Sequence, residues 1–595
     1  MKLSQFSHFL EKLEKTSERI KMTEILAALF TKAKKKEIDK IVYLSLGRLM
    51  PSFAGIEFNI AEKMMIKIIA SAFNKEVKEV QEEVKKSGDL GETVFEYKKQ
   101  VKSQASTLSV SQAYDKLMQI ANEGGAGSQE RKIKLMAELI KESDASSSKY
   151  IVRIPIGRLR LGFSDMTVLD ALSWMEKEDK SLRPKIEAAY SIAADTGLIA
   201  KTFKARGLSG LKKIRSQPGI PILPARAERL PDVQSIIDKL GKCALEPKID
   251  GFRVQIHLDR QLPGKKLIKK QAHLWEDKEN KFFLKIFSRN LEDTTNMFPD
   301  IALACQHLLS QKKNLRNCIL DGEAVGMNFQ TGKPFSFQKT AQRKRKYDIK
   351  KTSEDIPLVV FVFDLLFHND KLLINKKFRQ RRKQLASLLN FKGKDLRLTF
   401  QKIASKPEQI TKEFNRAVKG GWEGLMAKRL YAPYRPGARN YNWVKFKKST
   451  DSKLLDTLDC LVLGYYRGRG KRASFGIGAF LVGVRDPAKQ EFPTIAKIGT
   501  GLSDKQWVSL RKKCDQVKVR DQPKQYIVDK NLFPDIWCEP QIVVEIAADE
   551  ITKSPIHKAG IGLALRFPRL KRFRDKNPED ITTIKEVQKL YQKQK

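Results

Sequence analysis

A proline-rich passage at residues 216–232 (SQPGIPILPARAERLPD) divides the chain into parts with different periodicities. Proline lacks a backbone N–H and clashes with the preceding turn, so a helix cannot continue through this passage. Before it, apolar residues recur at helical spacing, as at Ile60, Met64 and Ile68. The pattern predicts an all-helical domain over residues 1–220.

After residue 220 the pattern changes to short strands with helices between them. The strand-like segments are 252–258 (FRVQIHL), 319–325 (ILDGEAV), 358–366 (LVVFVFDLL) and 443–447 (WVKFK). They alternate between apolar and polar residues or are continuously apolar, whereas 376–390 has helical spacing. These segments predict a mixed α/β domain over residues 221–449.

From residue 450 to 595, short strand-like segments such as 460–468 (CLVLGYYRG) are separated by glycine and charged turns. This spacing is typical of a small β-barrel of the oligonucleotide-binding (OB) kind. The expected architecture is therefore multidomain, with a helical domain, a mixed α/β domain and a C-terminal OB-fold. A chain of 595 residues is long enough for several domains of roughly 150 residues each.

The charge of the chain is strongly positive. Lys and Arg number 115 against 69 Asp and Glu, a formal net charge of +46, which exceeds what solubility requires. A polyanion such as nucleic acid is the expected partner, and the alternative is a basic composition shared by all proteins of the source. Within the helical part, Arg153, Arg158 and Arg160 alternate with apolar residues (YIVRIPIGRLRLGFS), which predicts either phosphate contact or a solvated face.

The six cysteines are sparse and include no C-x-x-C pair, which argues against a disulfide framework and a cysteine zinc ribbon. No apolar stretch reaches the ~20 residues of a membrane helix, and the N-terminus has no signal-peptide pattern. We expect no membrane association. The expected location is the cytoplasm, in association with the nucleoid, in a prokaryote, and the nucleus in a eukaryote.

The residues that could take part in catalysis lie in an ordered series of short motifs. The motifs are 246–251 (EPKIDG), 288–290 (SRN), 321–324 (DGEA), 363–364 (FD), 423–428 (EGLMAK) and 443–447 (WVKFK). A single K-x-D-G indicates no more than a lysine beside a turn, but six motifs in order are highly specific.

With these motifs the sequence resembles the ATP-dependent DNA ligases of the archaeal and eukaryotic replicative type, within the nucleotidyltransferase superfamily. The resemblance extends from FSHFLEKLEK near the N-terminus to SPIHKAGIGLALRFPRLKRFRDK near the end. It implies an enzyme that seals 5′-phosphate/3′-hydroxyl nicks in duplex DNA, through a covalent lysyl-AMP and a 5′-adenylated DNA intermediate. Such enzymes act in DNA replication, repair and recombination. The resemblance also implies that 1–220 binds DNA, 221–449 performs adenylation and 450–595 is the OB-fold.

The resemblance also assigns site residues. It implies Lys248 as the catalytic nucleophile and Mg²⁺, or Mn²⁺, held by Glu323 and Glu423. The ATP-binding residues that it implies are Glu246, Arg253, Arg289, Glu323, Phe363, Arg439, Lys445, Lys447 and Arg566. Arg569 and Lys576 are further candidates, beside Arg566, for orienting the β- and γ-phosphates before the barrel swings onto DNA.

The chemistry is consistent with these residue types. A phosphoramidate forms on a neutral amine, whereas an unperturbed lysine has a pKa of about 10.4. Burial and neighbouring positive charge favour the neutral form, and we expect Arg253, Lys445 and Lys447 to supply that charge to Lys248. A hard divalent cation requires oxygen ligands, which carboxylates provide.

The sequence lacks the signature motifs of other nucleotide-binding and hydrolytic enzyme classes. The sequence has no G-x-x-x-x-G-K-[ST], no G-x-G-x-x-G before a helix and no H-E-x-x-H, which disfavours P-loop, Rossmann and zinc-hydrolase functions. An NAD-dependent ligase should bring a cysteine zinc cluster. An RNA ligase, a capping enzyme and a non-catalytic nucleic-acid-binding protein remain alternatives.

The sequence also departs from the family pattern. A basic insertion at about 260–281 is longer than the expected hairpin, and a Q-x-x-L-x-x-F-F sliding-clamp box is not recognisable, which leaves a clamp partner open. We expect a monomer.

Overall fold

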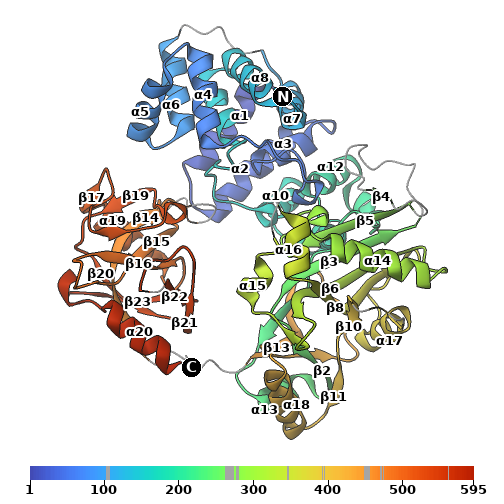
Figure 1. Cartoon of the computed structure of the whole chain (residues 1–595). Coiled ribbons are helices and arrows are strands. Elements are labelled where there is room, and N and C mark those ends of the chain that lie inside the picture. The colour runs from blue at the N-terminus through green and yellow to red at the C-terminus, as the bar shows by residue number, and fades with distance from the viewer. Residues whose placement is uncertain are drawn as a thin grey trace.

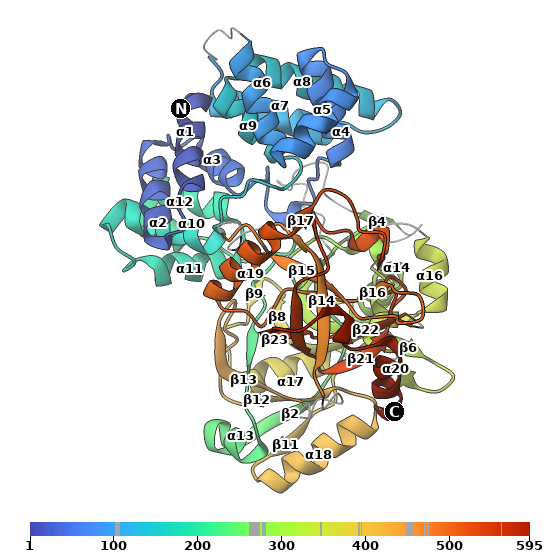
Figure 2. The same ribbon diagram turned by 90° about the vertical axis from the view of Figure 1, so that its left-hand side faces the viewer.

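The computed structural model describes residues 1–101, 107–260, 274–276, 281–344, 348–390, 393, 395–447, 456–468, 472, 475–560 and 562–594. Most of the predicted insertion, and the predicted boundary at 449/450, lie outside these residues. Figure 1 shows a helical part at the top and two parts containing β-strands below it. The view from the side places the C-terminal part in front of the middle part (Figure 2). Among the described helices, none is both long and apolar enough to span a membrane.

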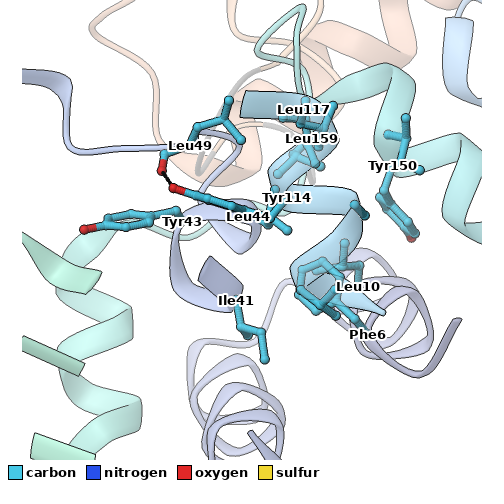
Figure 3. Packing of buried hydrophobic residues seen from close by; sticks show 14 of the residues in the cluster. Phe6, Leu10, Ile41, Tyr43, Leu44, Leu49, Tyr114, Leu117, Tyr150 and Leu159 are labelled. Atoms are coloured by element: carbon cyan, nitrogen blue, oxygen red, sulfur yellow. Dashed lines mark hydrogen bonds between the residues drawn. The ribbon is translucent and has the colours of Figure 1, made fainter. Parts of the chain in front are cut away.

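The N-terminal part is built from helices, as predicted. They are α1 (Leu3–Glu14), α2 (Arg19–Lys32), α3 (Ile38–Ser45), η1 (Ser52–Ala54), α4 (Glu62–Phe73), α5 (Val77–Ser87), α6 (Leu90–Gln100), α7 (Val110–Asn122), α8 (Ser128–Glu142), α9 (Ala145–Arg153), α10 (Asp165–Lys177), α11 (Arg183–Ile192) and α12 (Thr196–Leu211). The apolar faces of the α-helices form a single core, because their buried residues recur at spacings of three or four, as at Phe6, Leu10 and Leu13 on α1. In this core the Tyr114 hydroxyl donates to the Leu49 carbonyl at 2.6 Å (Figure 3).

The predicted phosphate-contacting role of Arg153 is wrong. Its side chain is 1% exposed and is paired with Glu14, Asp89 and Glu92 at 2.8, 2.9 and 3.1 Å. A buried arginine held by three carboxylates joins α1, α6 and α9 and has no surface to offer to DNA. Arg158 and Arg160 are partly exposed, so the prediction for these two stays open.

The middle part contains all the predicted α/β segments. Its elements are β1 (Arg226–Arg229), α13 (Val233–Leu240), β2 (Cys243–Lys248), β3 (Phe252–Asp259), β4 (Leu274–Glu276), β5 (Lys281–Ser288), η2 (Thr295–Met297), α14 (Pro299–Gln311), β6 (Asn317–Asn328), β7 (Lys333–Pro334), α15 (Phe337–Ala341), α16 (Ile349–Asp355), β8 (Leu358–His368), β9 (Lys371–Leu372), α17 (Phe378–Leu388), β10 (Leu396–Leu398), β11 (Lys402–Ala404), α18 (Pro407–Lys419), β12 (Gly424–Arg429) and β13 (Arg439–Lys447). The strands form one sheet in the order β1-β13-β12-β2-β11 and a second in the order β10-β8-β6-β3-β5-β4.

Each of these sheets has its own apolar core. Helices α13 and α18 pack on the first sheet, through residues such as Ile236 and Ile410. Helices α14 and α17 pack on the second sheet, through residues such as Leu308 and Leu385. The faces of the two sheets that are not covered by these helices are therefore available to form a site between them.

The proline-rich linker is bound to the second sheet through a buried histidine. The Gly219 N–H donates to His257 Nδ1 at 3.1 Å, which makes His257 Nε2 the ring nitrogen that donates to Gln255 Oε1 at 2.9 Å. Gln255 Oε1 also accepts from the Ile222 N–H. Burial lowers the pKa of His257 to about 3, so the imidazole is neutral in the folded protein.

The C-terminal part is rich in β-strands that curl around two apolar clusters, which confirms the predicted barrel domain. Its elements are β14 (Leu458–Tyr466), β15 (Ala479–Gly483), β16 (Phe492–Ile498), α19 (Asp504–Gln516), β17 (Lys518–Val519), β18 (Tyr526–Ile527), η4 (Lys530–Leu532), β19 (Ile536–Cys538), β20 (Val543–Ala547), β21 (Glu550–Lys553), β22 (Leu563–Arg566), β23 (Arg569–Arg574), η5 (Pro578–Asp580) and α20 (Ile584–Lys593). Strand β14 pairs with β15 along one edge and with β19 and β20 along the other. A shift in register between Val462 and Gly464 bends it.

Candidate active site

A cavity of about 440 Å³ lies between the two sheets of the middle part. Strands β2, β12 and β13 line it from the first sheet, and β3, β6 and β8 line it from the second. Nine of the predicted site residues line this cavity: Glu246, Lys248, Arg253, Arg289, Glu323, Phe363, Arg439, Lys445 and Lys447. A larger cavity of about 790 Å³ lies between the helical part and the barrel, and it is lined by Arg158 and Arg160 but by no residue of the six motifs.

The predicted nucleophile is held by a carboxylate from the neighbouring strand. Lys248 at the end of β2 is opposite Gly424 on β12, and Gly424 is opposite Lys447 on β13. Glu423, which precedes Gly424, accepts from Lys248 through Oε2 and from Lys447 through Oε1. Burial raises the pKa of Glu423, but the two ammonium groups lower it more, so that the net shift is downward.

Gly424 makes this row of residues possible. Its φ of 151° lies outside the usual range of other residues, and an added Cβ would stand 2.3 Å from the Phe446 carbonyl oxygen. Only glycine therefore lets β12 approach β13 closely enough for Glu423 to reach Lys248 and Lys447.

Arg253 and Glu323 face each other across β3 and β6. The Arg253 guanidinium is fixed by Asp321, with Nε to Oδ1 at 2.8 Å, and by the Tyr434 hydroxyl at 3.0 Å. Burial raises the pKa of Glu323 to about 7, although Arg253 and Lys248 act in the opposite direction. Glu323 is therefore a carboxyl whose ionised form depends on positive charge close by.

The opposite end of the cavity is aromatic and holds the carboxylate of Glu246. Phe363 on β8 makes an edge contact with Trp443, with ring centroids 5.7 Å apart. Glu246 accepts from Lys428 at 2.6 Å, from Gln401 at 3.0 Å and from Arg382 at 3.3 Å. An aromatic face beside a fixed acceptor suits a flat heterocycle that carries a donor group.

The remaining cations surround the lysine end of the cavity. Arg289 follows β5, and Arg439 and Lys445 lie on β13. Burial lowers the pKa of Lys445, and the neighbouring Lys447, Arg439, Lys248 and Arg289 add to the effect. This concentration of positive charge around Lys248 suits a polyphosphate.

Arg566 reaches the middle part from the barrel, whereas the two related candidates do not. Arg566 on β22 contacts Asp250 at 3.6 Å and Glu550 at 2.7 Å. Strand β22 lies on the side of the barrel that faces the middle part (Figure 1). Arg569 is paired with Asp549 and Lys576 with Asp459, both within the barrel.

The donor set fits a magnesium ion. Within the part of the chain that the structure describes, no cluster of three or more His, Cys, Asp or Glu is arranged to hold a metal. Mg²⁺, however, is commonly held by one or two carboxylates together with substrate phosphates. Glu323, which lines the cavity, and Glu423, which contacts Lys248, supply such carboxylates.

The sequence predicted no role for the groups that orient these residues, although Asp321 and Lys428 lie within the motifs. Asp321 and Tyr434 hold Arg253, while Gln401, Arg382 and Lys428 hold Glu246. Arg381 is also buried, with Nε and Nη2 on Asp364 at 2.8 and 2.9 Å. A signal existed for the two arginines, because Phe378, Arg381, Arg382, Leu385 and Leu388 share the buried face of α17 at spacings of three and four.

Comparison with known proteins agrees with this geometry. Models of the DNA ligase N terminus, the ATP dependent DNA ligase domain and the ATP dependent DNA ligase C terminal region match residues 2–173, 272–447 and 473–577. The chain is 42% identical to a probable DNA ligase of Dictyoglomus turgidum over 602 residues, covering 100% of this chain and 98% of that one. It is 36% identical to DNA ligase 2 of Thermofilum pendens over 614 residues, covering 100% of this chain and 97% of that one.

A solved structure supports the same fold. The structure named Pmar-Lig_Pre has a TM-score of 0.54 and 19% identity, covering 96% of this chain and 99% of that chain. Since the family models match most of the sequence and the relatives are similar over its whole length, the protein belongs to the ATP-dependent DNA ligase family.

Proposed function

We propose that Lys248 is the nucleophile of this ligase and that the cavity between the two sheets is its ATP site. The observation that carries the proposal is that one cavity is lined by the aromatic ring of Phe363, the carboxylate of Glu246, the amine of Lys248 and several further cations. The adenine lies beside Phe363 with its amino group toward Glu246, and the triphosphate lies among Arg289, Lys445 and Lys447.

The first step is the attack of neutral Lys248 Nζ on the α-phosphorus of ATP. A P–N bond forms, the P–O bond to pyrophosphate breaks, and the amine gives up its proton. Lys248 begins as the hydrogen-bonded partner of Glu423, so the carboxylate is placed to accept that proton. Lys445 and Lys447 add positive charge to the same cavity, where the triphosphate lies.

Glu323 and Glu423 would hold Mg²⁺ together with the substrate phosphates. The ion would supply positive charge for the developing negative charge on the phosphate oxygens. Arg566 orients the β- and γ-phosphates, since it reaches Asp250 in the loop after Lys248.

AMP then passes to a DNA 5′-phosphate, and the 3′-hydroxyl displaces it to seal the nick. We propose that 1–220, 221–449 and 450–595 move as separate units around duplex DNA, because no buried apolar core is shared between the helical part, the middle part and the barrel among the described residues. The working form is a monomer in the cytoplasm. A sliding-clamp partner stays open.

The test is a sealing assay on a DNA duplex with one 5′-phosphate/3′-hydroxyl nick. We expect sealing with ATP and Mg²⁺, no sealing when NAD replaces ATP, and weaker sealing when RNA strands replace DNA. Binding to DNA should weaken by about 0.9 log unit per log unit of salt for each phosphate contact. Sealing of RNA alone, or sealing that requires NAD, would contradict the proposal.

A further inference from the structure

Glu246 is held by more donors than its neighbours in the cavity. Its side chain is 2% exposed, and Oε1 accepts from Gln401 and Arg382 while Oε2 accepts from Lys428. A carboxylate has about four acceptor positions. The described contacts occupy three of them, which leaves one toward the cavity that Glu246 lines.

Lys428 is the central member of this set. It is 1% exposed on β12, where Met426 is opposite Glu246 and Lys428 is opposite Ala244, so that Lys428 and Glu246 share a face of the sheet. Its ammonium lies 2.6 Å from Glu246 Oε2 and 4.7 Å from the centroid of the Phe363 ring. It also donates to the Phe363 carbonyl at 3.4 Å. One buried cation therefore contacts both groups that face the proposed adenine.

The pair is electrostatically interdependent. Burial lowers the pKa of Lys428, and the carboxylate of Glu246 counteracts this effect. Removing the ammonium would leave a buried carboxylate without its closest counter-charge, which favours reorientation of Glu246. A rotated carboxylate no longer presents a fixed acceptor to the cavity.

We infer that Lys428 is the positioning residue for base recognition: with Gln401 it holds Glu246 as a fixed acceptor, so that the cavity selects a purine with an amino group at C6. A carbonyl oxygen at C6 would face a negative oxygen instead of donating to it. The inference rests on the placement of the base proposed above.

The experiment compares lysyl-nucleotide formation from ATP and from inosine triphosphate, which carries a carbonyl at C6. We expect Lys428→Met to lower the ratio of kcat/KM for ATP to kcat/KM for inosine triphosphate by about tenfold to a hundredfold, which is the range for a lost hydrogen bond to a charged group. The change should appear mainly as a higher KM for ATP, because the contact binds substrate and transition state alike. A wild-type ratio in folded Lys428→Met would overturn the inference.

Lys285→Met is the matched control. Lys285 is also a buried lysine, paired with Asp293 in the same domain, and it does not line the cavity. Its variant should keep the wild-type ratio. If Lys428→Met does not fold, Gln401→Leu tests the same geometry. It should lower the ratio by a smaller factor, and a wild-type ratio there would also overturn the inference.

Glu246→Gln separates this inference from the proposed function. If Lys428 acts through Glu246, Lys428→Met should lower the ratio no further in the Glu246→Gln background. A wild-type ratio in Glu246→Gln itself would show that the base placement is wrong. A low ratio in Glu246→Gln with a wild-type ratio in Lys428→Met would reject the role of Lys428 alone.

Discussion

The guanidinium of Arg566 lies 3.6 Å from the carboxylate of Asp250, although 315 residues separate them and they belong to different domains. Asp250 follows Lys248 by two positions, in the loop between β2 and β3. The barrel is therefore oriented with this arginine beside the loop that follows the proposed nucleophile.

Arg566→Ala should lose most lysine adenylation, by roughly 10²-fold, because its charge would stabilise the departing pyrophosphate. It should retain sealing of a nick supplied with a 5′-AMP, since no pyrophosphate leaves in that reaction. Both reactions are measured on one preparation. Arg572→Ala, an exposed arginine paired with Glu545 in the same barrel, is the control and should keep both. Normal adenylation with failed sealing would assign Arg566 to DNA instead.

Lys248→Ala and Lys248→Arg should both fail to form the AMP adduct, since a guanidinium is effectively never deprotonated. Mass spectrometry of proteolytic peptides after incubation with ATP and Mg²⁺ locates the adduct. Lys242→Ala, at an exposed lysine just before β2, should be labelled as wild type. Label at full yield in Lys248→Ala would refute the assignment.

Gly424→Ala should lower the free energy of unfolding by about 1–3 kcal/mol and slow adenylation, because the backbone is strained for any other residue. The added Cβ would clash with the Phe446 carbonyl, 2.3 Å away. Gly420→Ala is a close control, since its φ is −75° and its Cβ would meet nothing nearer than 3.4 Å. Urea denaturation measures both. Equal stability of the two variants would argue against a backbone conformation at Gly424 that only glycine adopts without strain.

The stability of the protein should fall in acid through His257. Its pKa is depressed to about 3 in the folded protein, so protons bind preferentially to the unfolded chain below an unfolded pKa of about 6.5. The contribution is present above pH 6.5 and is lost as the pH falls toward 3. At pH 5 the loss amounts to about 2 kcal/mol, at 1.36 kcal/mol per pKa unit.

Denaturation at pH 7 and pH 5 tests this. His257→Asn should be destabilised at pH 7 but should lose less stability than wild type between the two pH values. His8→Asn, at a histidine whose side chain is 62% exposed, should keep the full pH dependence. A wild-type pH dependence in His257→Asn would show that protonation of His257 contributes nothing.

Most of the elements followed from local patterns, whereas the residues of the cavity followed from the resemblance of the motifs to the ligase family. The strands around Lys248, Glu323 and Phe363 have apolar residues at strand spacing, and the motifs lie within or directly beside them. Proline at 216–232 separates the helical periodicity from the strand periodicity for a local steric reason.

Contacts between side chains that are far apart in the sequence could not be predicted. Lys428 and Glu246 are 182 positions apart, and Arg253 and Tyr434 are 181 apart, so no short pattern connects them. Arg153 was misassigned for the same reason, because its carboxylate partners come from α1 and α6. Alternation with apolar residues is compatible with a surface and with a buried ion pair.

The cavity lies between two sheets that each pack on an apolar core of their own, and this position affects the cooperativity of unfolding. A nucleotide that contacts both sheets is released when either one opens, so its binding free energy opposes both opening reactions. Saturating ATP should therefore slow amide hydrogen exchange in β2 and in β6 together, and the two halves of the middle domain should unfold as one unit.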